Sequence, residues 1–263
     1  LPGMGDIDSS LLWFCSQIRK KVTVALSGEG ADEIFGGYPW FYREDLLKTD
    51  GFPWMADVGL REKVLTPPWR EKLQLSSYVK QRYRETLAEV PLLDGEEEED
   101  RRRRELTYLN MLWFMACLLE RKDRMSMAAG LEVRVPFADH RLVQYMWNVP
   151  WQMKHLEGRE KGLLRKALEG ILPSEVLYRK KSPYPKTFHP LYGERVRKTL
   201  LSACEDKQSP LFEVVDRKAL KEVIQGESFA ERPWYGQLMR GPQVMAFYLQ
   251  LYWWFKAYDV KII

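Results

Sequence analysis

The first hydrophobic pattern of the chain predicts a helix, a strand and a loop in close succession. Apolar positions recur at helical spacing over residues 8–20, where Asp8 can cap the helix start. Residues 22–26 (VTVAL) are apolar and mostly β-branched, as in a buried strand, and glycines and small residues follow from Ser27 onward. This order is the unit of a parallel sheet. No other strong strand pattern is visible, so we expect the partner strands to lie outside this chain.

The remaining apolar patterns predict helices. Residues 105–129 carry apolar side chains over a wide surface, which predicts a long central helix. Shorter helical patterns cover residues 74–89, 191–203, 217–225 and 243–258. The last of these is rich in aromatic residues and is predicted to be a packed helix, with a partner interface as the alternative.

A block of charge precedes the predicted central helix. Acidic residues 96–100 are followed directly by basic residues 101–104. The acid-before-base order favours a solvated helix with i,i+4 ion pairs over a contact to phosphate or RNA.

Composition is that of an ordinary globular protein and argues against a nucleic-acid binder and a membrane-spanning protein. Of the 263 residues, 45% are hydrophobic and 30% are charged, and the net charge of +4 does not suggest a dedicated nucleic-acid binder. No run approaches the ~18 apolar residues of a membrane span. Three cysteines and three histidines have no zinc or disulfide spacing, which favours reduced thiols in the cytoplasm. Because the opening residues from Leu1 read like the interior of a loop, we expect a fragment.

Candidate chemistry is concentrated in the loop after the strand, residues 26–38 (LSGEGADEIFGGY). Gly28 and Gly30 allow the backbone to approach a phosphate closely, and Ser27 adds a hydroxyl. The three carboxylates of the loop offer the oxygen ligands that Mg²⁺ prefers. The residues alone leave two interpretations open: a nucleotide site at the carboxyl end of a strand, or an ordinary acidic helix start.

Three sequence blocks together resemble glutamine-hydrolysing asparagine synthetases. Residues 26–38 are similar to the second ATP-site motif of that family, and residues 123–139 (DRMSMAAGLEVRVPFAD) are similar to its central motif. Residues 160–167 (EKGLLRKA), followed by residues 179–186 (RKKSPYPK), form the third block. The blocks come in the family's order and are specific as a set.

The resemblance implies a mostly α-helical fold with one or few parallel strands. The chain would be the C-terminal part of an α/β adenine-nucleotide hydrolase-like domain of the PP-loop type. Residues 1–45 would carry the strand–loop nucleotide motif, and residues 46–263 would be the helical remainder. The family's first ATP loop (Ser-Gly-Gly-x-Asp-Ser) and its glutaminase domain are absent from this sequence. We therefore expect both upstream, and we expect the fragment alone to be inactive.

The resemblance also implies a reaction. ATP and aspartate would form β-aspartyl-AMP and pyrophosphate, and ammonia would then displace AMP to give asparagine. Glutamine would supply the ammonia in the full-length enzyme. ATP and Mg²⁺ are the implied cofactors, and a homodimer is a further prediction, whereas neither a nucleic acid nor a membrane is expected as a partner.

Residue roles follow from the matching motifs. Ser27 and Gly28 fall where the family contacts ATP. Glu29 falls at the acidic position that is tied to forming and consuming the adenylate. Asp32 would bind ATP by holding Mg²⁺ on its phosphates.

Basic residues of the third block complete the implied site. Lys161 matches the lysine that faces the α-phosphate and the leaving pyrophosphate, and it should approach Glu29 and Asp32, although alone it reads as a surface lysine. Arg165, one helical turn later, would share a face with Lys161 and assist in ATP binding. Downstream, Lys180, Lys181 and Lys186 either meet phosphate or belong to a rigid, turn-rich loop.

Two points stay open at this stage. Glu132 and Arg134 would point the same way in an extended segment, either toward the aspartate substrate or as an ion pair. A β-lactam synthetase-like adenylating enzyme and a non-catalytic helical interaction module are the alternatives to the asparagine synthetase reading.

Overall fold

The computed structural model describes residue 3 and residues 6–55, 58–182, 187, 189–226 and 239–262. The chain divides into two compact units, which we describe separately. Unit 1 comprises Leu1–Trp13, Trp54–Arg82 and Pro185–Ile263, and unit 2 comprises Phe14–Pro53 and Tyr83–Tyr184. Helices α1 (Asp6–Arg19) and α6 (Leu75–Ala88), both predicted within two residues, cross this division.

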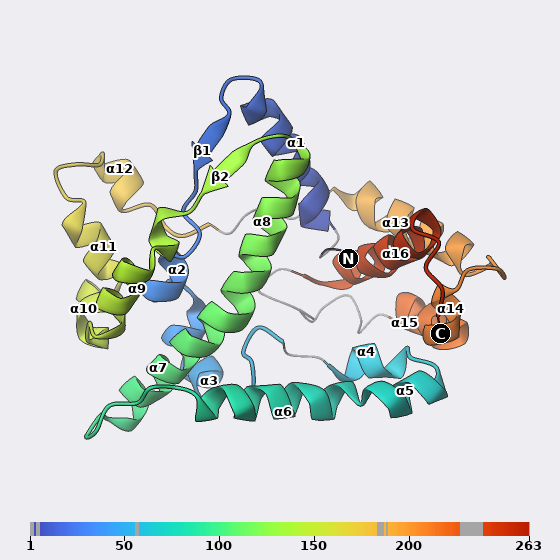
Figure 1. The fold of residues 1–263 in the computed structure, drawn as a ribbon, viewed down its shortest axis with the longest axis horizontal. Helices are drawn as coiled ribbons and strands as arrows, with labels where there is room; N and C mark the ends of the chain where they lie inside the picture. Colours follow the sequence, from blue (N-terminus) through green and yellow to red (C-terminus); the bar gives the residue numbers. More distant parts are fainter. Residues whose placement is uncertain are drawn as a thin grey trace. The chain divides into compact units, whose positions relative to one another are not determined.

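The sheet of unit 2 pairs β1 (Val24–Leu26) with β2 (Glu132–Arg134) in parallel (Figure 1). Ala25 lies opposite Val133, and the amide of Ser27 extends the ladder by donating to the carbonyl of Arg134 at 2.9 Å. The expectation that all partner strands lie outside this chain is therefore wrong. A strand of three residues with polar ends has too few positions to show a period-2 pattern.

The central helix begins earlier than predicted and changes its hydrogen bonding midway. It consists of α7 (Glu98–Leu109), the π-helical segment η2 (Asn110–Met115) and α8 (Ala116–Ala128), and α8 packs along β2 (Figure 1). Its first turn is acidic, and acids are stabilised at a helix N-terminus by the macrodipole. Residues 98–104 of the charge block thus belong to this helix, and Glu97 is its N-cap.

The arginines of α7 are only partly solvated, which corrects the prediction of a fully solvated charged face. The expected pairs are present, for example Arg103 with Glu99 at 2.7 Å. The guanidinium groups also bind distant backbone: Arg102 donates to the carbonyls of Leu47 and Thr49, at 2.9 and 2.7 Å. Because arginine carries five donors, one side chain can satisfy an acid and a loop carbonyl together.

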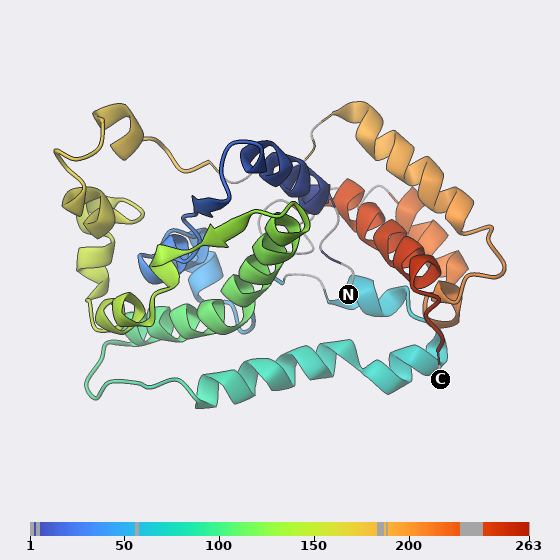
Figure 2. The same cartoon turned by 45° about the horizontal axis from the view of Figure 1, so that its top comes forward.

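The rest of unit 2 surrounds the loop that follows β1. A small core joins Ile34, Phe35 and Met146, and Tyr38, Trp40 and Phe114 form an aromatic cluster beside it. The short elements of this region are α2 (Ala31–Ile34), η1 (Pro39–Phe41), α3 (Glu44–Leu47), η3 (Pro136–Ala138), α9 (His140–Trp147), α10 (Trp151–Lys154), η4 (Leu156–Gly158), α11 (Gly162–Ala167) and α12 (Ser174–Leu177). Helices α10 and α11 lie against each other (Figure 2).

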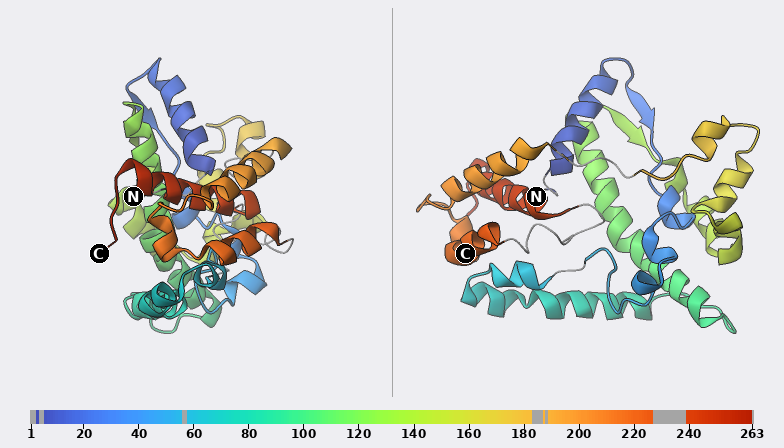
Figure 3. Two further views of the ribbon diagram at one scale, coloured as in Figure 1. Left: turned by 90° about the vertical axis from the view of Figure 1, so that its right-hand side faces the viewer. Right: turned by 180° about the vertical axis from the view of Figure 1, so that it is seen from behind.

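Unit 1 is helical and has its own core. Helices α13 (Pro190–Ala203) and α16 (Gly241–Ala257) pack side by side (Figure 3). The other elements are α4 (Gly59–Lys63), α5 (Pro67–Leu73), α14 (Leu211–Val214) and α15 (Arg217–Gln225). The predicted aromatic helix is confirmed as a packed element, because α16 buries Tyr248 and Tyr252 in this core. The prediction of residues 217–225 as a helix agrees with α15.

The observed fold class agrees with the prediction: the described residues are mostly helical and contain one short parallel sheet. In the part of the chain that the structure covers, no helix is both long and apolar enough to cross a bilayer.

Candidate active site

The loop after β1 is shaped by a glycine at its turn. Gly30 caps α2 with φ of +94°, which L side chains rarely adopt. A Cβ at Gly30 would also lie 3.0 Å from the backbone of Phe137. Gly28 differs, because a Cβ there would meet nothing within 4 Å. The loop is therefore closely packed at Gly30 and borders open space at Gly28.

Glu29 is fixed between a hydroxyl and an ammonium. The Ser27 hydroxyl donates to Oε2 of Glu29, and Nζ of Lys122 on α8 lies 2.9 Å from Oε1. Burial alone would raise the pKa of Glu29, but the Ser27 hydrogen bond and the Lys122 charge outweigh it and lower the pKa. Glu29 is therefore ionised at neutral pH. Lys122 was not singled out by the sequence analysis.

Asp32 lies between two lysines from distant segments. Nζ of Lys161 is 3.0 Å from Oδ1 of Asp32, and Nζ of Lys181 is 3.1 Å from Oδ2. Lys181 also donates to the carbonyl of Gly37 at 2.9 Å and lies 4.0 Å from the ring centre of Tyr38. Burial lowers the pKa of Lys181, although the Asp32 charge opposes this. The predicted approach of Lys161 to Asp32 is confirmed, whereas the ion pair of Glu29 is with Lys122.

The glycine pair that ends the loop makes room for this arrangement. A Cβ at Gly37 would lie 1.8 Å from Oδ1 of Asp32, and one at Gly36 would lie 2.4 Å from the ring of Trp151. Any side chain at Gly37 would push the Asp32 carboxylate away from its lysines. Gly37 thus contributes to the site by leaving room for the Asp32 carboxylate.

Glu33, the third carboxylate of the loop, points into the protein. It is buried and accepts a hydrogen bond from the Tyr38 hydroxyl at 2.9 Å. Burial raises the pKa of Glu33 to about 6. This carboxylate supports the loop from within and does not join the lysine cluster.

Lys161 caps the start of α11 with a left-handed backbone, φ +56°, one turn before Arg165. The Arg165 amide donates to the Lys161 carbonyl at 3.0 Å, and both residues line one cavity, in agreement with their expected common side. The Arg165 guanidinium donates to the carbonyls of Glu160 at 2.9 Å, Leu177, and Arg179 at 3.4 Å. Arg165 therefore ties together the segments that carry Lys161 and Lys181.

The remaining predicted residues lie apart from this cluster or outside the described part of the chain. Glu132 and Arg134 form an exposed ion pair at 2.7 Å, as the second of the two interpretations predicted. Lys180 makes no contact with Asp32 among those observed. Lys186 lies outside the described residues.

A basic cavity of about 260 Å³ adjoins the cluster. Both lysines that bind Asp32 line it, and the other lining residues are Leu164, Arg165, Leu168, Leu172, Val176, Leu177, Arg179, Lys180 and Ser182. The cluster of Asp32 with Lys161 and Lys181 carries one positive charge in excess. Such a site suits an anionic ligand whose negative charge grows during a reaction.

Comparison with known proteins gives a family match. The family model described as asparagine synthase matches residues 1–256. Asparagine synthetase [glutamine-hydrolyzing] 3 of Bacillus subtilis is 59% identical over 263 residues, covering 100% of this chain and 42% of its own length. Human asparagine synthetase [glutamine-hydrolyzing] is 31% identical over 172 residues, covering 64% of this chain and 21% of its own length. The chain thus spans about two fifths or less of these relatives.

Proposed function

Because this chain belongs to the asparagine synthase family, we propose that it is the C-terminal part of the synthetase domain of a glutamine-hydrolysing asparagine synthetase. Relatives with that name are more than twice as long as the matched segment, which supports a separate glutaminase domain and a first ATP loop in the full-length protein. As in the sequence analysis, residues 1–45 carry the strand–loop nucleotide motif and residues 46–263 the helical remainder. The chain's free thiols support a cytoplasmic location.

The proposed reaction has two steps. An oxygen of the aspartate side-chain carboxylate attacks the α-phosphorus of ATP, the bond to the β-phosphate bridge breaks, and pyrophosphate leaves from β-aspartyl-AMP. Ammonia then attacks the acyl carbon, the bond to the AMP oxygen breaks, and asparagine forms with release of a proton. The first step concentrates negative charge on pyrophosphate, so cations at that position accelerate it.

Lys161 and Lys181 are the cations that we assign to this task. The single observation that carries the proposal is their convergence on Asp32 beside a basic cavity of about 260 Å³. Two ammonium groups on one carboxylate leave net positive charge for a phosphate oxygen. Both groups come from the third sequence block; the resemblance assigns Lys161 to phosphate, and phosphate contact was one of two interpretations of Lys181.

Glu29 is assigned to the amidation step. Its lowered pKa keeps it ionised, so it can hold ammonia by accepting a hydrogen bond. A carboxylate of low pKa is a weak base, but the adduct formed by ammonia on the acyl carbon is far more acidic than the ammonium ion. Glu29 can therefore take the proton that the adduct loses.

Asp32 fits a Mg²⁺ ligand in its chemistry, since Mg²⁺ is often held by one or two carboxylates together with substrate phosphates. Bound there, the ion would neutralise phosphate charge. Both carboxylate oxygens of Asp32 already lie next to lysines. To bind Mg²⁺, Asp32 must therefore lose its contact with one lysine, which would bind a phosphate oxygen of ATP in its place. Asp32 then serves as the group that keeps the lysines in place before ATP binds.

Ser27 and Gly28 are proposed to contact the nucleotide, supported by the open space in front of Gly28. We assign Arg165 the role of positioning Lys161 and Lys181 in place of direct ATP binding, because carbonyls of both flanking segments accept its hydrogen bonds. Glu132 and Arg134 stay as proposed aspartate contacts, supported by their position on the strand that pairs with β1; binding of aspartate would have to open their exposed ion pair. The homodimer stays a prediction.

The test is aspartate-dependent exchange of pyrophosphate into ATP by the full-length protein. Lys161→Met and Lys181→Met should each lower the exchange rate at least about 100-fold, as removal of a preorganised charge donor does. Lys48→Met removes a lysine that is 67% exposed in the same unit and should leave exchange unchanged. Exchange at the wild-type rate in either of the first two variants would refute the assignment.

A further inference from the structure

A second cavity in unit 2 has no part in the proposed reaction. It has a volume of about 180 Å³. Helix α7 and residues 147–154 form most of its wall, and it shares no lining residue with the basic cavity at Lys161 and Lys181. This volume is well above the ~30 Å³ that one water occupies in the liquid, so a small organic molecule fits.

One cation of this cavity, Lys154, has no ion-pair partner among the described residues. Lys154, at the end of α10, lines the cavity and is 8% exposed. No residue in the described part of the chain forms a hydrogen bond or ion pair with its ammonium group. Burial, helped by the nearby charge of Arg104, lowers the pKa of Lys154 to about 8, so the group is still mostly protonated at neutral pH. A buried charge in this state is costly unless a partner compensates it.

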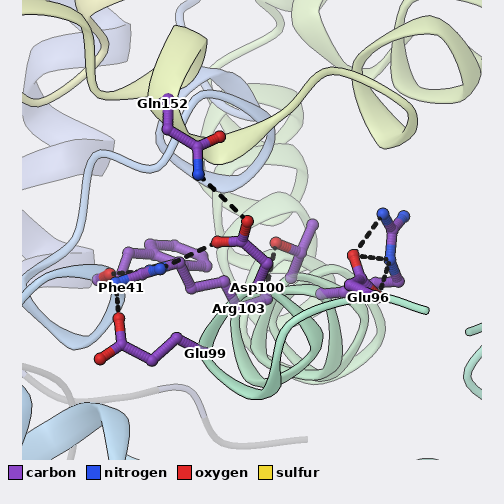
Figure 4. Close-up of polar contacts among 8 residues, drawn as sticks. Phe41, Glu96, Glu99, Asp100, Arg103 and Gln152 are labelled. Carbon is purple, nitrogen blue, oxygen red and sulfur yellow. Dashed lines mark hydrogen bonds and ion pairs between the residues drawn. The ribbon is translucent and has the colours of Figure 1, made fainter. Parts of the chain in front are cut away.

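The acids that line the cavity cannot be that partner, because arginines already occupy them. Glu96 accepts three hydrogen bonds from Arg104, between 2.7 and 3.0 Å. Asp100 accepts from Arg103 at 3.0 Å and from the Gln152 amide at 3.3 Å, and Figure 4 shows both groups directed at its carboxylate. Arg103 also pairs with Glu99 at 2.7 Å, so both lining arginines have acidic partners, whereas no ion pair of Lys154 is observed among the described residues. A negatively charged ligand in the cavity would supply that partner.

The apolar part of the lining indicates the body of the missing anion. The rings of Trp147 and Trp151 contribute to the wall, together with Leu93, Val149 and Pro150. Aromatic and aliphatic walls around one charged group are typical of sites for small organic ligands. We propose that this cavity binds a small organic carboxylate, with Lys154 as its ion-pair partner.

The site has a physical connection to the candidate active site. Trp151 is part of the cavity wall, and its ring fills the space beside Gly36, where a Cβ would lie 2.4 Å from it. Gly36 adjoins Gly37, whose carbonyl accepts a hydrogen bond from Lys181. A carboxylate that holds Trp151 in place thereby also restrains the glycine pair.

The experiment is calorimetric titration of the full-length protein with sodium benzoate at pH 7, without ATP. Benzamide, which has nearly the same shape and no charge, is the ligand control. We expect saturable benzoate binding and at least tenfold weaker binding of benzamide. Equal binding of the two ligands, or no saturable heat at millimolar benzoate, would overturn the proposal.

Variants locate the site and separate it from the proposed function. Lys154→Met should bind benzoate at least tenfold more weakly, whereas Lys48→Met and Lys161→Met should bind it as the wild type does. Loss of binding in Lys161→Met with retention in Lys154→Met would move the site to the other cavity and overturn the proposal. Lys154→Met should fold, because replacing an unpaired buried charge by an apolar group of similar size is neutral or stabilising. Circular dichroism checks this.

A pH series on the wild type gives a readout that does not depend on variants. Benzoate affinity should fall as the pH rises above about 8, where Lys154 loses its proton. The other charged groups that line the cavity are Arg103, Arg104, Glu96 and Asp100. His155, the adjacent residue, has a lowered pKa through burial and stays neutral there. Affinity that does not change across this range would contradict a role for the ammonium.

Discussion

Gly37→Ala tests whether the position of Asp32 decides activity. A Cβ at Gly37 would lie 1.8 Å from Oδ1 of Asp32, whereas an ordinary contact begins at 3.4 Å. The carboxylate must therefore move by about 1.6 Å, and its contacts with Lys161 and Lys181, now 3.0 and 3.1 Å, cannot both survive. Misplacement of catalytic groups by ~1 Å costs ~100-fold in rate. We expect at least that loss in aspartate-dependent pyrophosphate exchange.

The loss of stability in Gly37→Ala should be smaller than the loss of activity, which corresponds to at least ~2.7 kcal/mol. Both ion pairs are about one quarter exposed, so each contributes only ~1 kcal/mol or less to the free energy of unfolding. Urea unfolding of the full-length protein measures this difference. Gly193→Ala is the matched control. Gly193 lies inside α13, and a Cβ there would meet only the Pro242 side chain, at an ordinary contact distance of 3.6 Å. Gly193→Ala should therefore keep both activity and stability. Exchange by Gly37→Ala within threefold of the wild-type rate would refute the reasoning.

The remaining predictions concern Lys122, Glu33 and Arg165. Lys122→Met removes a charge that lowers the pKa of Glu29, so the acid limb of the pH profile for ammonia-dependent synthesis should move to higher pH. If this limb does not move, the protonation state of Glu29 does not control the rate. Burial raises the pKa of Glu33 from 4.5 to about 6 in the folded protein, so its stabilising contribution is present below pH 4.5 and lost as the pH rises through 6. Relative to Glu33→Gln, the wild type should lose about 2 kcal/mol of unfolding free energy across that window, and parallel urea curves for the two proteins would contradict this. Arg165→Met should lower pyrophosphate exchange, because the segments that carry Lys161 and Lys181 are no longer held together. Added guanidinium should restore part of the exchange. Exchange at the wild-type rate in this variant would show that Arg165 does not position the lysines.

The parts of the site that lie close together in sequence could be predicted. Residues 26–38 bring glycines and carboxylates together within one strand–loop unit, and the resemblance added Lys161 from the third sequence block. The local pattern did not show that Glu33 is buried, because its burial depends on where Tyr38 packs.

Lys122 and Lys181 show what the sequence left undetermined. Their partners, Glu29 and Asp32, are far away in the chain, and either lysine reads as a surface residue on its own. One signal was available: Lys122 lies three and four residues after Leu119 and Leu118, hence on the apolar face of its helix. A lysine on such a face requires a buried acid, and only the fold identifies it as Glu29.

The two departures in secondary structure have related causes. Strand β2 is three residues long and depends on β1 for its hydrogen bonds, so its own pattern carries little information. The π-helical segment η2 interrupts a helix whose sequence pattern is continuous, because i→i+5 bonding follows from packing around buried residues such as Asn110 and Phe114.

The central claim, that Lys161 and Lys181 manage the phosphate charge of an aspartate adenylate, is tested most directly by oxygen transfer. Full-length protein is supplied with ATP, an ammonium salt and aspartate labelled with ¹⁸O in its side-chain carboxylate, and the AMP is analysed by mass spectrometry. The account predicts one ¹⁸O atom in each AMP from the wild type, and almost no labelled AMP from Lys161→Met or Lys181→Met. AMP without label from the wild type, or labelled AMP at the wild-type rate from both variants, would contradict it.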